Sequence, residues 1–191
     1  SYEPAVSDDG RFIIFASDAD NLVADDNNGV KDIFVRDRQE NTTQRLSVAS
    51  DGTEANAGSD APEISGDGTV AVFRSEATNL VSDDTNNARD IFSHDLLSAR
   101  TERLSVNSLG DEANAAAFTM PAITSDGRYV AFYSAANNLA ANDFNASWDI
   151  FVHDRTERVT NIVSVNNDGM AGDASSFEPG ISANGHYVVF G

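Results

Sequence analysis

The chain of 191 residues contains no cysteine, only one tryptophan and a single lysine, Lys31. Without thiols, neither disulfides nor a thiolate metal site can stabilise the fold. No stretch approaches the ~18 to 20 consecutive apolar residues that cross a bilayer, and the N-terminus shows no charged-then-apolar signal segment. We therefore expect no membrane insertion.

Basic residues are also scarce, since 12 Lys and Arg stand against 31 Asp and Glu and give a net charge of −19. Such a charge repels phosphate backbones and anionic membrane surfaces, so we expect no nucleic-acid partner. Two explanations remain for the acidic residues: ligands for a divalent cation, or a solubilising surface suited to saline surroundings. We assign most of them to the surface and look for ligands among those that recur at fixed positions.

What the sequence does contain is a long repeat. Pro4, Pro62, Pro121 and Pro179 each open a short segment that ends in Gly and precedes an apolar run, and they lie 58, 59 and 58 residues apart. A fixed period of this length indicates repeated structural modules. We interpret 1–191 as a single region with repeats at about 4–61, 62–120 and 121–178 and a partial repeat at 179–191.

The first repeat predicts four short strands. An extended stretch over 3–7, a turn at 8–10 and an apolar strand over 11–15 form a hairpin, and strands over 32–37 and 42–48 follow a long polar loop. No window has the i, i+3, i+4, i+7 spacing of an amphipathic helix, so we expect an all-β fold. A β-sandwich is an alternative, but it does not require one four-strand pattern at a fixed period, whereas a β-propeller does.

The motifs of this repeat resemble those of the TolB-type, WD40-like β-propeller family, in which Ser-Pro-Asp-Gly and a hydrophobic strand precede Asp-Ile-Tyr-Val-x-Asp. The matching segments cover essentially the whole chain and are 7–10 with 32–37, 65–68 with 90–95, and 125–127 with 149–154. The chain departs from the family pattern in three ways. It lacks the proline of the turn, its third turn is interpreted as shortened, and its loop between the second and third strands is longer. The resemblance implies a β-propeller and, from its periplasmic and secreted members, a location outside the cytoplasm.

The longer loop carries the pattern D-x-N-x-x-x-D in all three repeats. Its oxygen-bearing residues are Asp26, Asn28 and Asp32, then Asp84, Asn86 and Asp90, then Asp143, Asn145 and Asp149. Calcium takes six to eight oxygen ligands, and a short loop can supply them from alternating side chains and backbone carbonyls. The pattern begins like an EF-hand loop but lacks its closing glutamate, so we predict calcium sites with a Kd of about 10⁻⁴ to 10⁻³ M. The alternative is turn chemistry alone, with Asp capping backbone amides and Asn in the left-handed region.

Other residues give little support for catalysis. The three histidines, His94, His153 and His186, are interpreted as surface variants on strands, and no nucleophile elbow, zinc-binding helix motif or phosphate-binding loop is present. We therefore expect a non-enzymatic chain. In the third loop alone, two aromatic residues, Phe144 and Trp148, lie near Asp149 within the pattern, which indicates either a contact surface for a ligand such as a glycan or a cap that shields the loop from solvent.

Three blades and a hairpin are fewer than a propeller needs to close its ring. We therefore expect either a fragment of a longer polypeptide or self-assembly through open blade edges. The sequence thus predicts a calcium-stabilised, non-enzymatic β-propeller that acts as a binding or structural module in an extracellular, cell-surface or periplasmic location, with a protein or glycan partner. The alternative is the propeller portion of a larger secreted hydrolase or lyase whose catalytic residues lie outside this chain.

Overall fold

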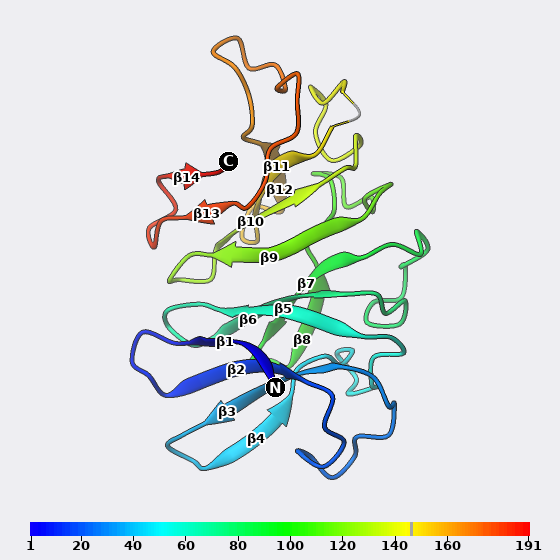
Figure 1. Ribbon diagram of the computed structural model, residues 1–191, viewed down its shortest axis with the longest axis vertical. Helices are drawn as coiled ribbons and strands as arrows, with labels where there is room; N and C mark the ends of the chain where they lie inside the picture. Colours follow the sequence, from blue (N-terminus) through cyan, green and yellow to red (C-terminus); the bar gives the residue numbers. More distant parts are fainter. Residues whose placement is uncertain (146) are drawn as a thin grey trace.

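The structure, a computed structural model, describes residues 1–145 and 147–191 and places fourteen β-strands and no helix within them (Figure 1). The strands are β1 (Tyr2–Val6), β2 (Phe12–Ser17), β3 (Asp32–Asp37), β4 (Thr42–Arg45), β5 (Ser59–Ile64), β6 (Val70–Ser75), β7 (Asp90–Asp95), β8 (Arg100–Arg103), β9 (Ala117–Ile123), β10 (Tyr129–Ser134), β11 (Asp149–Asp154), β12 (Val159–Ile162), β13 (Gly180–Ile181) and β14 (Val188–Val189). No helix in the described part of the chain is long and apolar enough to cross a bilayer.

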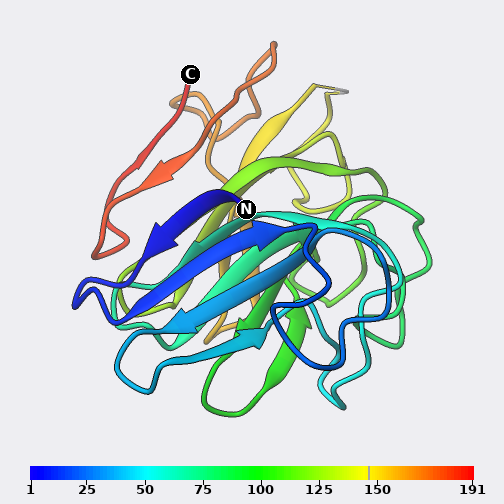
Figure 2. The same ribbon diagram turned by 60° about the horizontal axis from the view of Figure 1, so that its bottom comes forward.

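The strands form three four-stranded antiparallel blades, β1 to β4, β5 to β8 and β9 to β12, followed by the hairpin β13–β14. Within each blade, consecutive strands are neighbours. The first strands lie against one another from blade to blade, β1 beside β5 and β5 beside β9, so the blades stack around a common axis (Figures 1 and 2). The ring is not closed. The all-β, partial β-propeller predicted from the repeats is therefore confirmed.

The turns between the first two strands of each blade join the blades near the axis. The amide of Asp8 donates to the carbonyl of Gly66 at 2.8 Å, and the amide of Asp67 donates to the carbonyl of Ser125 at 2.9 Å. A proline at position 8 would have no amide hydrogen for this bond, which gives a physical reason for the missing turn proline there. The third turn is not shortened as the sequence suggested, because Thr124 takes the part that serine plays in the first two turns.

One predicted repeat boundary and one predicted strand boundary shift for identifiable reasons. The first strand of the second blade begins at Ser59, ahead of Pro62, and its register is interrupted between Asp60 and Glu63. A proline cannot donate to the ladder, so an irregularity of this kind is where a strand tolerates it. The fourth strand of the first blade ends at Arg45 instead of continuing to Val48, which forms an isolated bridge with Glu54.

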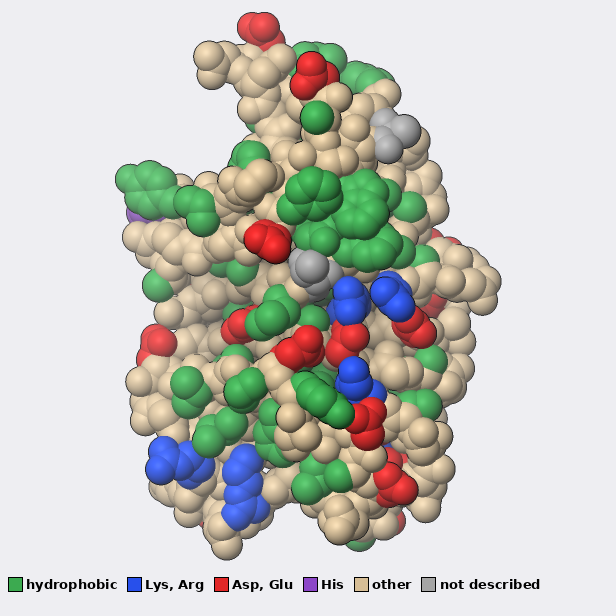
Figure 3. Space-filling view, viewed as in Figure 1, with side chains coloured by type: hydrophobic (Ala, Val, Ile, Leu, Met, Phe, Trp, Pro, Cys, Tyr) green, Lys and Arg blue, Asp and Glu red, His purple; other side chains and the backbone are tan. Residues whose placement is uncertain are grey.

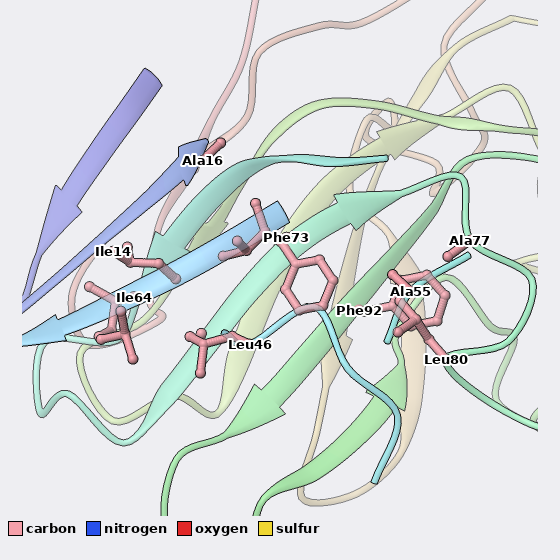
Figure 4. Close-up of a cluster of buried hydrophobic side chains, with 12 residues drawn as sticks. Ile14, Ala16, Leu46, Ala55, Ile64, Phe73, Ala77, Leu80 and Phe92 are labelled. Atoms are coloured by element: carbon pink, nitrogen blue, oxygen red, sulfur yellow. The ribbon is translucent and has the colours of Figure 1, made fainter. Parts of the chain in front are cut away.

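The hydrophobic core lies between blades, in one cluster for each pair of neighbours. The cluster between the first and second blades includes Ile14, Leu46, Phe73 and Phe92, all at most 2% exposed (Figure 4). An equivalent cluster joins the second and third blades. The long loops contribute to these clusters as well, since Ala77 and Leu80 of the second loop are buried in the first cluster.

Candidate functional site

The long loop of the first blade is built around a buried aspartate. Asp32 opens β3 and is fully buried, and its carboxylate accepts hydrogen bonds from the hydroxyl of Ser47 and, at 2.8 Å, from the Asn28 amide. The same serine oxygen accepts the amide of Ile33 at 3.0 Å. The oxygen of Asn28 accepts the amide of Val30 at 3.1 Å, so this residue also holds the turn. The aspartate therefore ties the loop to the segment that follows β4.

An arginine occupies the place beside this loop where a cation would be expected. Arg45 Nη1 lies 2.9 Å from Asp26 Oδ1 and 3.9 Å from Asp32 Oδ2, and its Nη2 lies 2.6 Å from Glu54 Oε1. Its side chain is only 7% exposed. Burial raises the pKa of Asp26 and of Asp32, and the arginine opposes that effect by stabilising their charged forms. The first loop thus carries its own positive charge.

The second blade repeats this arrangement with a longer ion pair. Arg103, buried like Arg45, lies 3.4 Å from Asp84 Oδ1 and 2.9 Å from Glu112 Oε2. The Asn86 amide donates to Asp90 at 2.9 Å. Burial, and then the nearby charge of Asp90, raise the pKa of Asp84 to about 6. In both loops, Asn and Asp therefore adopt the same geometry beside a buried arginine.

The third blade lacks the arginine and its glutamate partner. Ile162 and Ala171 lie at the positions that Arg45 and Glu54 have in the first blade. Ile162 of β12 is paired with β11 as Arg45 of β4 is paired with β3, and Ala171 forms the isolated bridge of this blade as Glu54 does in the first. Both substitutions occur together in this blade, so one whole ion pair is replaced by two apolar side chains.

Two buried carboxylates remain in the third loop. Asp143 is 6% exposed and Asp149 fully buried, and among the described residues Asp143 Oδ1 and Asp149 Oδ2 have no hydrogen-bond partner. Burial, and then the charge of Asp149, raise the pKa of Asp143 to about 6. The Asn145 amide donates at 2.8 Å to the carbonyl of Gly172. A surface hollow of about 750 Å³ reaches Asp143.

The structure therefore brings the three predicted oxygen-bearing residues of each loop together, but in different electrostatic surroundings. Among the described residues, no group of three or more His, Cys, Asp or Glu side chains is placed to hold a metal ion. Calcium binding stays a prediction. The left-handed residue of the first two loops is not the predicted asparagine but the one after it, Gly29 and Asn87; the equivalent Ala146 lies outside the described residues.

Sequence reasoning missed the residues that complete these loops. They are the arginines and glutamates of the first two blades and the serines Ser47, Ser105 and Ser164. A signal for them exists, because Arg45-Leu-Ser47 and Arg103-Leu-Ser105 recur at the same place in their repeats. In the third repeat the corresponding residues are Ile162-Val-Ser164, which shows the loss of the arginine directly.

A second feature of the third blade is a cluster of four aromatic rings, Phe118, Tyr133, Trp148 and Phe177. The rings of Phe118 and Trp148 stack with centroids 4.3 Å apart, Tyr133 stacks on Trp148 at 5.4 Å, and Phe177 packs edge-on against Trp148 at 5.7 Å. Phe177 is 40% exposed, and Phe118 and Trp148 are partly buried. Hydrophobic side chains gather in a broad patch in the region where the third blade lies (Figure 3). Phe144, which the sequence grouped with Trp148, is 77% exposed.

The second blade has charged residues where the third has this aromatic cluster. Asp60 faces Arg74 across β5 and β6, as Phe118 faces Tyr133 across β9 and β10, and the two charged side chains form an ion pair at 2.8 Å. Arg89, which precedes β7 as Trp148 precedes β11, pairs with Glu76 at 2.6 Å. An open hollow of about 470 Å³ lies beside the cluster, lined by Phe118, Glu76, Thr78, Asn87 and Arg89 with three alanines. The aromatic surface thus adjoins hydrogen-bonding groups.

The interpretation of the histidines as surface residues is wrong for two of them. His94 and His153 are 5% and 4% exposed, and the Nδ1 of each lies 2.9 Å from a threonine hydroxyl, that of Thr101 or Thr160. Each threonine hydroxyl in turn donates to a carbonyl of the preceding blade. The histidines are buried because a neighbouring blade covers that side of the sheet, which a single repeat does not reveal. His186 is exposed, as expected.

Comparison with family models and with curated proteins finds no match. Solved structures do match in fold. The crystal structure of TolB from Acinetobacter baumannii aligns over 99% of this chain, with 18% sequence identity and a TM-score of 0.58. A putative TolB from Agrobacterium tumefaciens aligns over 100% of this chain, with 18% sequence identity and a TM-score of 0.55. An oligogalacturonate lyase from Vibrio parahaemolyticus aligns over 94% of this chain, with 13% sequence identity and a TM-score of 0.54.

These likenesses show a TolB-like β-propeller fold, since identities this low carry the fold alone. The chain spans only 37%, 58% and 41% of the three matched chains. The resemblance predicted from the repeat motifs is thus confirmed for the fold.

Proposed function

We propose that this chain is a non-catalytic part of a β-propeller that acts outside the cytoplasm and binds a neutral glycan at the aromatic cluster of its third blade. The observation that carries this proposal is the replacement of the ion pairs of the second blade by Phe118, Tyr133 and Trp148 at matching positions. The repeated fold does not require aromatic residues there, because the second blade forms the same sheet with charged ones.

The surroundings of the cluster suit a sugar. Sugar rings present C–H faces that pack on aromatic side chains and hydroxyls that need hydrogen-bonding partners. The hollow beside Phe118 offers both, since Thr78, Asn87 and Glu76 supply donors and acceptors. The net charge of −19 disfavours an anionic polysaccharide, so we assign the site to neutral chains. The likeness of the fold to TolB supports the location outside the cytoplasm.

A second candidate function is the propeller portion of a larger secreted hydrolase or lyase, with catalytic residues outside this chain. It is favoured by the likeness in fold to an oligogalacturonate lyase. A galacturonate oligomer is anionic, and the strongly acidic chain would repel it. The electrostatics therefore favour the first proposal.

Trp148 makes the proposal directly measurable, because it is the only tryptophan of the chain. Its fluorescence should shift on titration with neutral cello-, xylo- or manno-oligosaccharides and stay unchanged with galacturonate oligomers. Phe118→Ala should weaken binding at least about tenfold, since alanine removes one face of the stack. Phe144→Ala, an exposed aromatic of the same blade outside the cluster, is the matched control and should bind like the wild type.

The proposal fails if no neutral oligosaccharide shifts the fluorescence, or if Phe144→Ala weakens binding as much as Phe118→Ala. Binding of galacturonate oligomers, with their breakdown by the full-length protein, would favour the second candidate.

A further inference from the structure

We propose that the third loop binds one divalent cation of the calcium type through Asp143, Asn145 and Asp149, and that the first two loops bind none because Arg45 and Arg103 occupy the equivalent place. This inference goes beyond the proposed glycan-binding function and does not depend on it. It narrows the three sites predicted from the sequence to one.

The argument starts from what the three loops share. Each has two aspartates with little or no exposed side chain, at the start of the pattern and at the start of the third strand. Buried like charges are costly unless a positive charge compensates them. In the first loop the compensating charge is Arg45, 2.9 Å from the first aspartate, and in the second it is Arg103 at 3.4 Å.

The third loop keeps both aspartates and has an isoleucine, Ile162, where the arginine stood. Asp149 Oδ2 also lacks the amide donor that its counterparts receive from asparagine, and Asp143 Oδ1 has no partner among the described residues. The oxygens of Asp84 in the second loop have no hydrogen-bond partner either, but they lie beside the charge of Arg103. In the third loop, two buried oxygens from different carboxylates are thus left without any donor. Two negative charges match one divalent cation, which restores the compensation that the arginine gives elsewhere.

The donor set points to a hard cation. The donor groups are oxygens, from two carboxylates and the side-chain amide of Asn145. The chain has no thiol, and no imidazole is among the described residues that line the hollow at Asp143, so nothing there favours a softer metal. The side-chain nitrogen of Asn145 donates to the Gly172 carbonyl, and its oxygen accepts the Ser147 amide at 2.6 Å, which leaves one lone pair of that oxygen for a cation. The hollow that reaches Asp143 gives an entry path and room for water to complete the coordination.

The experiment uses terbium as a luminescent substitute for calcium. Trp148 is the residue before Asp149, so its excitation can sensitise the luminescence of a terbium ion bound there. We expect saturable terbium luminescence that calcium displaces, one bound calcium per chain by metal analysis, and a higher unfolding temperature in millimolar calcium than in chelator. Asp143→Asn should reduce luminescence and calcium affinity more than about tenfold. Asp84→Asn, the same change in the second blade, is the matched control and should leave stoichiometry and affinity unchanged.

A second variant tests whether the arginine and the cation replace one another. Ile162→Arg combined with Ala171→Glu rebuilds the ion pair of the first two blades, so it should fold, lose calcium binding and lose the calcium-dependent rise in unfolding temperature. The inference is overturned if the wild type binds no calcium. It is also overturned if about three calcium ions bind per chain, if Asp143→Asn binds calcium like the wild type, or if the rebuilt ion pair leaves binding intact. None of these outcomes bears on oligosaccharide binding, which is measured separately in chelator.

Discussion

Acidification should destabilise the contact between the second and third blades through His153. This side chain is buried, and its Nδ1 lies 2.9 Å from the hydroxyl of Thr160. Because that hydroxyl donates to the carbonyl of Val106, the histidine must donate from Nδ1 and carries one proton in the neutral form. A second proton would place a charge between the blades.

The magnitude follows from the shift in pKa. Burial lowers the pKa of His153 from 6.5 to about 4, with the charge of Asp154 opposing the shift. The unfolded chain therefore takes up a proton below about pH 6.5, and the folded chain does so only near pH 4. The contribution of the neutral His153 to folding stability is complete above about pH 6.5 and is lost as the pH falls from 6.5 to about 4. At 1.36 kcal/mol per unit, the loss approaches about 3 kcal/mol.

The assay compares the wild type with His153→Asn, whose side-chain amide can still donate to Thr160 but does not titrate. Urea unfolding at pH 7, 6, 5 and 4, followed by circular dichroism, gives the free energy of unfolding of each. Subtracting the two profiles removes the opposite contribution of Asp84, whose raised pKa favours the folded state as pH falls. We expect the wild type to lose about 3 kcal/mol relative to the variant between pH 7 and 4. Parallel profiles would refute the reasoning.

Two further predictions concern the second blade and the turns at the axis. Arg103→Met should lower the free energy of unfolding by about 3 to 5 kcal/mol, measured with urea in the presence of chelator, because it leaves Asp84 buried without a counter-charge. Adding Asp84→Asn should restore most of this loss. A double variant no more stable than the single one would contradict the ion-pair argument. Gly68→Ala should lower stability by about 2 to 4 kcal/mol, because the residue has φ +72° and a Cβ would lie 2.6 Å from the Phe12 ring. Gly52→Ala, at φ +87° with no atom within 4 Å, should cost only about 1 to 2 kcal/mol, and equal losses in thermal unfolding would show that the contact with Phe12 is unimportant.

The fold could be predicted from the sequence because the signals that specify a blade are local and repeated. The Asp-Gly turn, the apolar second strand and the Asp32–Asp37 segment each report on residues that are close along the chain. Their recurrence at a fixed period then supplies the architecture. The boundaries were less accurate where a distant group decides them, as at Arg45, where the chain leaves the sheet so that Ser47 can reach Asp32.

The candidate site could be predicted only in part, for the same reason. The D-x-N-x-x-x-D pattern predicts the loop oxygens but does not distinguish the three loops. The residue that distinguishes the third loop, Ile162, lies outside the pattern on the fourth strand of the blade, 13 residues after Asp149. The burial of His94 and His153 also depends on the neighbouring blade. Comparing all aligned positions of the repeat, and not only those that recur, would have identified Ile162 as the exception.

The third blade departs from the others at two adjacent residues, and this adjacency links the two proposals. Trp148 belongs to the aromatic cluster, and Asp149, the next residue, belongs to the loop without an arginine. In the first two blades the residue before the buried aspartate is Lys31 or Arg89, and the loop is held by an internal ion pair. A loop held by a cation differs from one held by arginine in that its order depends on an external supply of metal. All three blades keep the same four-strand order, so both departures change the surface and the loop of the third blade without altering its place in the propeller.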